Sequence, residues 1–146
     1  MNKITVMLLL ILTVSCSDKN ETESIFITNK NEYWQYDNYC NNTCCIYFQF
    51  HENGSHDKYL LYTIEGFKLF NDDGDLESGP RTWSIKTDSI FVWDKEEYKI
   101  EKISNKEILL SYYHYKINGK KCYVRLSKWV KTPQGPKPVD SLDNVK

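Results

Sequence analysis

Apolar and polar residues alternate with a period of two along much of the chain, which is the pattern of half-buried β-strands. The clearest alternation runs from Trp83 to Tyr115, where turn residues such as Thr87-Asp88 and Ser104-Asn105-Lys106 interrupt it. No segment of helical length lies between these turns. The stretch therefore predicts strands joined as an antiparallel meander and argues against parallel βαβ units.

The same alternation continues on both sides of this stretch. Asn53-Gly54 is a hairpin turn between two earlier runs, and a last run ends near Trp129. We therefore predict an all-β domain over residues 25–130. The inner face is expected to carry Ile46, Phe48, Phe50, Ile90, Val92, Tyr98, Ile100, Val124 and Leu126. The outer face is expected to carry the large side chains of Tyr47, Phe91, Trp93 and Tyr123.

Length and composition narrow the class of protein. The chain has 146 residues, enough for one domain with tails. Its aromatic content is 14%, which suits a pleated, half-buried sheet. The net charge is -1 without a basic stripe, so we expect no nucleic-acid partner. The last segment, 131–146, is rich in proline and poor in large apolar residues, and predicts a disordered tail.

The N-terminus has the pattern of an export signal, predicted to cover residues 1–15. A positive Lys3 precedes the apolar run Ile4–Val14, which is too short to span a bilayer as a helix. The run Leu12-Thr13-Val14-Ser15-Cys16 resembles the lipobox of bacterial lipoproteins. That resemblance implies that Cys16 is acylated, becomes the mature N-terminus and attaches the protein to a membrane. The alternative is an ordinary signal peptide cleaved near Ser15.

Residues 16–24 are predicted to form a flexible tether after the lipidated cysteine. The segment is short, polar and acidic, with Asp18, Glu21 and Glu23. An acidic stretch at this place resembles the surface-export signal of Bacteroidota lipoproteins, which implies an outer-membrane lipoprotein exposed on the cell surface. The alternative is a plain spacer that leaves the domain in the periplasm.

Four cysteines remain when Cys16 is set aside, and an even number in an exported chain favours disulfides. Three connectivities are possible among Cys40, Cys44, Cys45 and Cys122. A bond between the neighbours at 44 and 45 is strained, so one of them is expected to pair with Cys40 and the other with Cys122. If Ile46 faces inward, the alternation favours Cys44 with Cys122 and Cys45 with Cys40. The C-x3-C-C spacing does not match the usual zinc ligand pairs, so we expect no metal.

Two other sets of residues are candidates for a calcium site or a catalytic site. The acidic turn Asn71–Glu77 has oxygen ligands at alternate positions, but its glycine is misplaced for a calcium loop, and we expect a solvated turn. His51, His56 and Asp57 lie around one hairpin turn, without a nucleophile motif or a phosphate-binding loop. We therefore expect neither an enzyme nor a cofactor.

Framework residues in the strands resemble the lipocalin-like lipoproteins of Bacteroidota over about residues 30 to 130. The pattern consists of a Trp in an early strand (Trp34), F-x-x-x-G at Phe50–Gly54, W-x-I-x-x-D-x-I from Trp83, and Y-x-I-x-x-I from Tyr98. The resemblance implies a small up-and-down β-barrel or a strongly curled meander that binds an apolar or amphipathic molecule. Because the predicted inner residues are bulky, we expect a filled core or a shallow cavity at one end.

Two functions of different classes remain open. In the first, the domain holds a small apolar or amphipathic ligand, with Trp34, Trp83 and Trp93 as wall or plug residues. In the second, a filled barrel is a protein-interaction module, such as an inhibitor, an immunity factor or an accessory subunit of an envelope complex. Its outward aromatic residues would then contact a protein partner.

Overall fold

The chain folds into one antiparallel sheet, as the alternation predicts. The computed structural model describes residues 20–71, 79–116 and 119–141, leaving aside the side chains of Cys44 and Ser141. A short helix, α2 (Glu21–Phe26), precedes the sheet, and a 3-10 turn, Val139–Ser141, follows it. The strands are β1 (Glu32–Asn38), β2 (Thr43–Phe50), β3 (His56–Tyr62), β4 (Gly66–Leu69), β5 (Trp83–Thr87), β6 (Ile90–Trp93), β7 (Glu96–Ile103), β8 (Glu107–Tyr113), β9 (Lys121–Thr132) and β10 (Gly135–Pro138).

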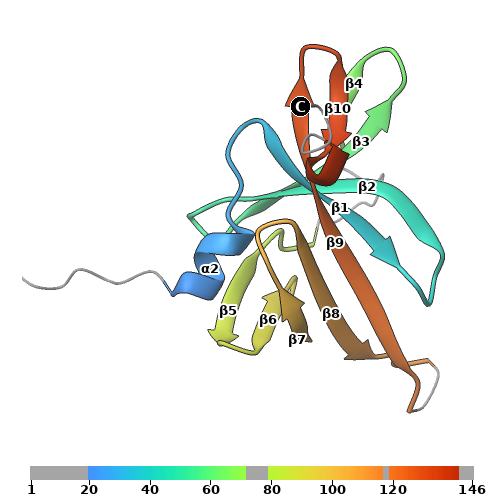
Figure 1. The fold of residues 1–146 in the computed structure, drawn as a ribbon. Helices are drawn as coiled ribbons and strands as arrows, with labels where there is room; N and C mark the ends of the chain where they lie inside the picture. Colours follow the sequence, from blue (N-terminus) through green and yellow to red (C-terminus); the bar gives the residue numbers. More distant parts are fainter. Residues whose placement is uncertain (1–19, 72–78, 117–118, 142–146) are drawn as a thin grey trace, which may run out of the picture.

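Two meanders share this sheet and meet at its centre. Its strand order is β4-β3-β2-β1-β9-β8-β7-β6-β5, and β10 pairs with the end of β9. Every neighbour is therefore consecutive in sequence except β1 and β9, which pair from Glu32 with Val130 to Asn38 with Val124. Figure 1 shows the long β9 crossing the molecule beside β1.

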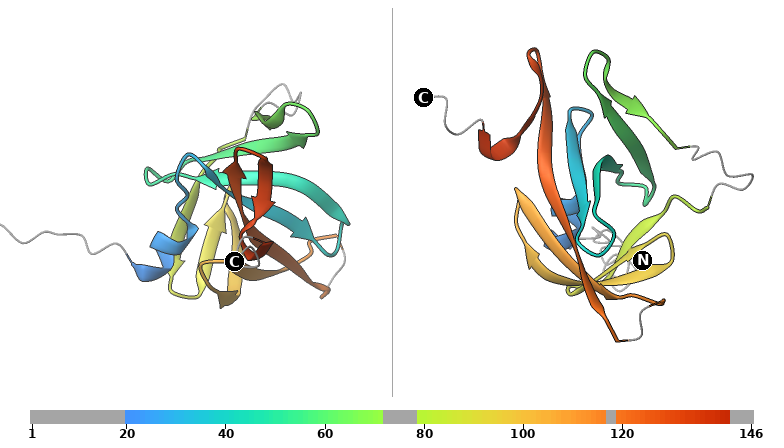
Figure 2. Two further views of the ribbon diagram at one scale, coloured as in Figure 1. Left: turned by 45° about the horizontal axis from the view of Figure 1, so that its top comes forward. Right: turned by 90° about the vertical axis from the view of Figure 1, so that its right-hand side faces the viewer.

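The sheet curls strongly but does not close into a barrel. Its two edge strands, β4 and β5, do not pair with each other. Among the described residues, one bridge, between Ser55 and Thr82, connects the residues just before β3 and β5. At this corner the N–H of Trp83 donates to the carbonyl of Gly54 (2.8 Å), and the N–H of His56 donates to that of Arg81 (3.2 Å). The prediction of a barrel or a strongly curled meander is thus confirmed only as a curled antiparallel sheet (Figure 2).

The inner face of the sheet carries the core, and most of the predicted inner residues lie there. One strand is a correction: in β6, Phe91 (0% exposed) and Trp93 (5%) face the core, and Ile90 and Val92 do not belong to it. Cross-strand pairing decides which residues of β6 face inward, because Trp93 lies opposite the buried Trp83. The buried core consists of Phe26, Trp34, Phe48, Phe50, Trp83, Phe91, Trp93, Ile108, Leu110, Val124 and Leu126.

Helix α2 covers one end of the curled sheet, which corrects the prediction of a flexible tether up to residue 24. Asn20 caps the helix by accepting a hydrogen bond from the N–H of Thr22 (3.0 Å). The helix places Phe26 in the core, stacked on Phe91 with ring centroids 4.3 Å apart. The indole of Trp34 donates to the carbonyl of Phe26 (2.9 Å), so this end is tied to β1 as well.

The outer face has a second, smaller aromatic cluster. Tyr47 is buried there, as its neighbours on adjacent strands cover it. Phe67 contacts Tyr47 with centroids 4.8 Å apart, and Trp129 contacts it at 5.5 Å. The predicted outward position of Tyr47 is therefore right, and other side chains of the same chain cover it.

The segment predicted as a disordered tail, 131–146, is structured as far as Ser141. Strand β9 continues to Thr132, and β10 turns back to pair Gly135 with Thr132 and Pro138 with Trp129. Proline is acceptable in an edge strand, because its missing N–H is not needed on the open side. Residues 142–146 lie outside the described part of the chain.

We predict that Phe26→Ala destabilises the domain strongly. Removal of a fully buried aromatic side chain costs about 3 to 5 kcal/mol, because the ring contacts are lost and a cavity remains. Urea unfolding followed by tryptophan fluorescence measures the free energy of unfolding. Tyr113→Ala, at a side chain that is 72% exposed, is the control. An effect of Phe26→Ala no larger than that of the control would contradict the buried position of Phe26.

Candidate functional site

Three tyrosines lie at the end of the curled sheet away from α2. Along β1 the inner row runs from Trp34, which bonds to α2, through Tyr36 to Asn38. Tyr98 on β7 and Tyr112 on β8 lie at the same end, with ring centroids 5.4 Å apart. We call Tyr36, Asn38, Tyr98 and Tyr112 the tyrosine cluster.

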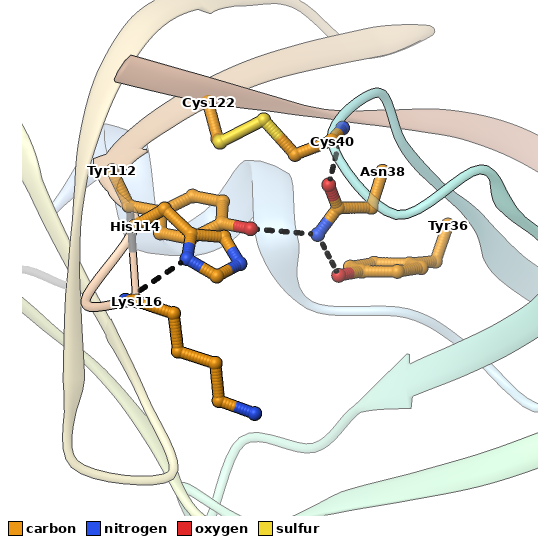
Figure 3. Close-up of a disulfide and its surroundings, with 7 residues drawn as sticks. All are labelled: Tyr36, Asn38, Cys40, Tyr112, His114, Lys116 and Cys122. Carbon is orange, nitrogen blue, oxygen red and sulfur yellow. Dashed lines mark hydrogen bonds between the residues drawn. A yellow bond between two sulfur atoms is a disulfide. The ribbon is translucent and has the colours of Figure 1, made fainter. Parts of the chain in front are cut away.

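Asn38 connects two of the three tyrosines. Its Nδ2 donates to the hydroxyl oxygen of Tyr36 (2.8 Å) and to that of Tyr112 (3.0 Å). Its Oδ1 accepts the backbone N–H of Cys40 (2.9 Å). Figure 3 shows the amide of Asn38 between the two phenol rings, beside the Cys40–Cys122 disulfide. The asparagine is only 4% exposed, whereas the tyrosines are half-buried.

Trp93 forms the floor of the tyrosine cluster. Its ring centroid lies 5.7 Å from that of Tyr36 and 6.1 Å from that of Tyr98, so the cluster continues directly into the core. Burial raises the pKa of Tyr98, and the neighbouring Tyr36 and Tyr112 raise it further. Burial also raises the pKa of Tyr36, although the hydrogen bond from Asn38 opposes this effect. Both hydroxyl groups therefore keep their hydrogens at neutral pH.

The disulfide beside the tyrosine cluster joins Cys40 to Cys122, with Cα atoms 5.7 Å apart. This corrects the favoured pairing of Cys44 with Cys122 and of Cys45 with Cys40. The alternation fails here because β1 and β2 shift register between Tyr36 and Asn38, and Cys45 has a positive φ of 68°. Cys45 is exposed on β2. The bond fixes the β1–β2 turn against β9, and hence the position of Asn38.

The three tryptophans predicted as ligand residues lie in the core instead of on an open surface. Trp34, Trp83 and Trp93 are each at most 5% exposed. Their indole nitrogens face groups inside the protein: that of Trp83 donates to the carbonyl of His51 (3.0 Å), and that of Trp93 lies 3.1 Å from Nε2 of His56. Only Trp93 contacts the tyrosine cluster.

Two histidines of the β2–β3 hairpin pair with carboxylates. Nε2 of His51 lies 2.8 Å from Asp57, and Nε2 of His56 lies 2.8 Å from Asp94 on the turn after β6. His51 and Asp57 are thus brought together, but His56 is paired across the open edge of the sheet. Asn71, the first residue of the acidic turn, donates to Asp57 (2.8 Å). The His51–Asp57 pair closes the β2–β3 hairpin, and the His56–Asp94 pair joins this hairpin to the turn after β6.

The remaining predicted sites are the lipidation site, the acidic turn and a metal site. Cys16 and the signal segment 1–15 lie outside the described residues, as do positions 72–78 of the acidic turn. Among the residues that are described, no group of three His, Cys, Asp or Glu could hold a metal ion. In the same residues, no helix has the length and the apolar composition needed to cross a membrane.

Sequence reasoning found Tyr98 as an inner residue but missed the tyrosine cluster. The available signal was a change in side-chain type along single inner rows, from Trp34 to Tyr36 to Asn38 on β1 and from Leu110 to Tyr112 on β8. Such a row reports that one end of the sheet is more polar than the other. No family model, curated protein or solved structure matches this chain.

We predict that the domain loses stability in alkali partly through Tyr98. Native Tyr98 keeps its proton to a higher pH than an unfolded tyrosine, whose pKa is 10.0. Its contribution is therefore complete below pH 10 and is lost as the pH rises, by up to about 1.4 kcal/mol per pH unit. Tyr98→Phe should make the fall in unfolding free energy above pH 10 less steep.

Urea unfolding at a series of pH values between 8 and 12 measures this slope, each variant being referred to its own value at pH 8. Some slope should remain in Tyr98→Phe, since burial also raises the pKa of Tyr33 and raises that of Tyr59 to about 12. Identical slopes in the wild-type protein and in Tyr98→Phe would show that this hydroxyl is not buried in the folded state.

Proposed function

We propose that this chain is a membrane-anchored lipoprotein whose lipocalin-like curled sheet binds a small amphipathic ligand at the tyrosine cluster. The observation that carries the proposal is the group of three half-buried tyrosines at the end of the sheet away from α2, where Asn38 binds Tyr36 and Tyr112, and Tyr98 packs against Tyr112. Ligand sites combine apolar and aromatic walls with a few fixed polar groups, and this cluster has both.

The order of side chains along the inner rows supports an amphipathic ligand. Near α2 the core is apolar, since Phe26 of the helix contacts Phe50 and Phe91. Away from α2, the inner rows of β1 and β8 reach Asn38 and Tyr112, which carry an amide and a phenol hydroxyl. A ligand with an apolar part and a polar head would match this change, because rings of Tyr offer an apolar face and a polar edge.

The anchoring part of the proposal rests on the N-terminal pattern. A short apolar run followed by Ser15-Cys16 supports acylation of Cys16. The domain begins at α2, a few residues further on, so the acyl chains would hold it close to the membrane surface. The Cys40–Cys122 disulfide is compatible with an exported protein, since such bonds persist in oxidising compartments. We place the protein at the outer membrane, facing outward.

A protein-interaction module is the second candidate, supported by exposed aromatic and apolar side chains at both hairpin ends. Tyr113 and Tyr115 are 72% and 84% exposed on the β8–β9 hairpin, and Ile64 is 96% exposed at the tip of β3–β4. A cleft of about 500 Å³ lies between the β3–β4 tip and the β9–β10 hairpin, lined in part by Phe67 and Pro136. A protein partner would cover such surfaces.

Ligand binding predicts that the protein carries a small molecule when purified from the organism that makes it. The full chain with Cys16→Ser, which lacks the acylation site, is analysed by native mass spectrometry before and after denaturation. We expect an additional discrete mass that is lost on denaturation. Tyr98→Ala should lower its occupancy severalfold, because one wall of the tyrosine cluster is removed, whereas Tyr113→Ala should retain it. A wild-type spectrum without any additional mass would favour the protein-interaction module.

Acylation predicts that Cys16 controls attachment to the membrane. Wild-type protein should incorporate labelled palmitate and sediment with membranes, and Cys16→Ala should do neither. Cys45→Ala is the matched control at an exposed cysteine within the domain, and it should keep the label. Label retained in Cys16→Ala would refute the lipoprotein assignment.

A further inference from the structure

The orientation of the Asn38 amide determines which way the hydrogen bonds of the tyrosine cluster run. Oδ1 of Asn38 accepts the backbone N–H of Cys40, a group that can only donate. The other terminal atom must therefore be the NH₂ group, with two hydrogens to donate. It lies 2.8 Å from the hydroxyl oxygen of Tyr36 and 3.0 Å from that of Tyr112.

Both tyrosine oxygens consequently act as acceptors toward Asn38, and their own hydrogens remain to be donated elsewhere. A phenol hydroxyl has one hydrogen to give in addition to the lone pairs that accept. Within the described part of the chain, Tyr36, Tyr98 and Tyr112 donate their hydroxyl hydrogens to no side chain or backbone acceptor. Three O–H donors therefore lie at one place without an acceptor among the described residues.

A fourth donor stands beside them. His114 lies two residues after Tyr112, just beyond the end of β8, and the two ring centroids are 6.3 Å apart. Nδ1 of His114 accepts the backbone N–H of Lys116 (3.2 Å), so a neutral ring carries its hydrogen on Nε2. Figure 3 shows the imidazole next to the ring of Tyr112, with Lys116 close by.

The charges around this place also favour an anion. The hairpin from Tyr113 to Tyr123 contains Lys116, Lys120 and Lys121 and no acidic residue. Lys121 is paired with Glu101 on β7 (2.6 Å), so the positive charge available to a ligand comes from Lys116 and Lys120. On the other side, the carboxylates of Asp94, in the turn after β6, and of Glu96, at the start of β7, help to raise the pKa of Tyr98. Asp94 is held 2.8 Å from His56. Hydrogen bonds from several neutral donors to one anionic group are stronger than those between neutral partners.

We propose that the hydroxyls of Tyr36, Tyr98 and Tyr112 bind the anionic head group, a carboxylate or a phosphate monoester, of an amphipathic ligand. The inference rests on the proposed ligand-binding function and specifies the ligand class. The apolar part of the ligand lies against the rings of the tyrosine cluster, and His114 and Lys116 flank the head group. Asn38 is a positioning residue, because it sets the direction in which two of the hydroxyls donate.

Three probes with the same alkyl chain separate the head group from the chain: decanoate, decyl phosphate and decanol. Isothermal titration calorimetry of the full chain with Cys16→Ser gives the Kd of each. We expect at least one of the two anions to bind about tenfold or more tightly than decanol. The preferred anion identifies the head group.

Three variants test the roles of the individual groups. Tyr112→Phe keeps the ring and removes one donor. It should therefore weaken binding of the preferred anion about tenfold and leave the affinity for decanol unchanged. Asn38→Asp keeps the shape but turns the tyrosine hydrogens toward its own carboxylate and adds a negative charge. It should therefore weaken binding of the anion more than Tyr112→Phe does, again without changing the affinity for decanol. Tyr113→Phe, on the next residue of β8, should change neither affinity.

The outcomes distinguish this inference from the proposed function. Equal affinities for decanol and both anions would overturn the inference of an anionic head group and leave the proposed ligand binding intact. Anion preference that survives in both Tyr112→Phe and Asn38→Asp would also overturn it. Failure of all three probes to bind would overturn the inference together with the proposed function.

Discussion

The stacking of Phe26 inside the curled sheet is the contact on which the rest of the architecture depends. Its ring meets Phe50 from β2, Trp83 from β5 and Phe91 from β6, which are strands on both sides of the unpaired edge. Among the described residues, backbone pairing there is limited to the Ser55–Thr82 bridge and its neighbours. A side chain from outside the sheet therefore supplies the cohesion that hydrogen bonds would provide in a closed barrel. The opposite end, where the tyrosines lie, has no such plug among the described residues.

Much of the fold could be predicted, because a buried sheet face imposes a period of two on the sequence. The prediction failed where that period carries no information. Ile90 to Trp93 are all apolar, so alternation alone cannot choose a face, and the pairing of Trp83 with Trp93 decides it. Helix α2 is only six residues long and mostly polar, too short to show a helical period. The proline-rich sequence of β10 is typical of a linker, but the segment forms an edge strand.

The candidate site was much less predictable, since it depends on distances between strands that are far apart in the sequence. Tyr36 and Tyr112 are joined only through Asn38, and the direction of its amide depends on the turn that places the N–H of Cys40. The disulfide prediction failed for a related reason. It assumed unbroken alternation through Cys44 and Cys45, whereas the register shift next to Asn38 brings Cys40 to β9. Local irregularities of this kind are invisible in a pattern, yet they position the polar groups.

The pairing of β1 with β9 has a consequence for how the chain reaches its folded state. These two strands are the only neighbours in the nine-strand path that are not consecutive in sequence, and Glu32 meets Val130 there. Contacts so distant along the chain slow folding, because the entropy of closing a long loop is lost before the contacts can stabilise the chain. Each meander can form its hairpins early, but the two halves join only after residues 121–132 have emerged. A chain still passing through a ribosome or a translocation pore thus keeps one edge of each half open until β9 emerges and joins the two halves.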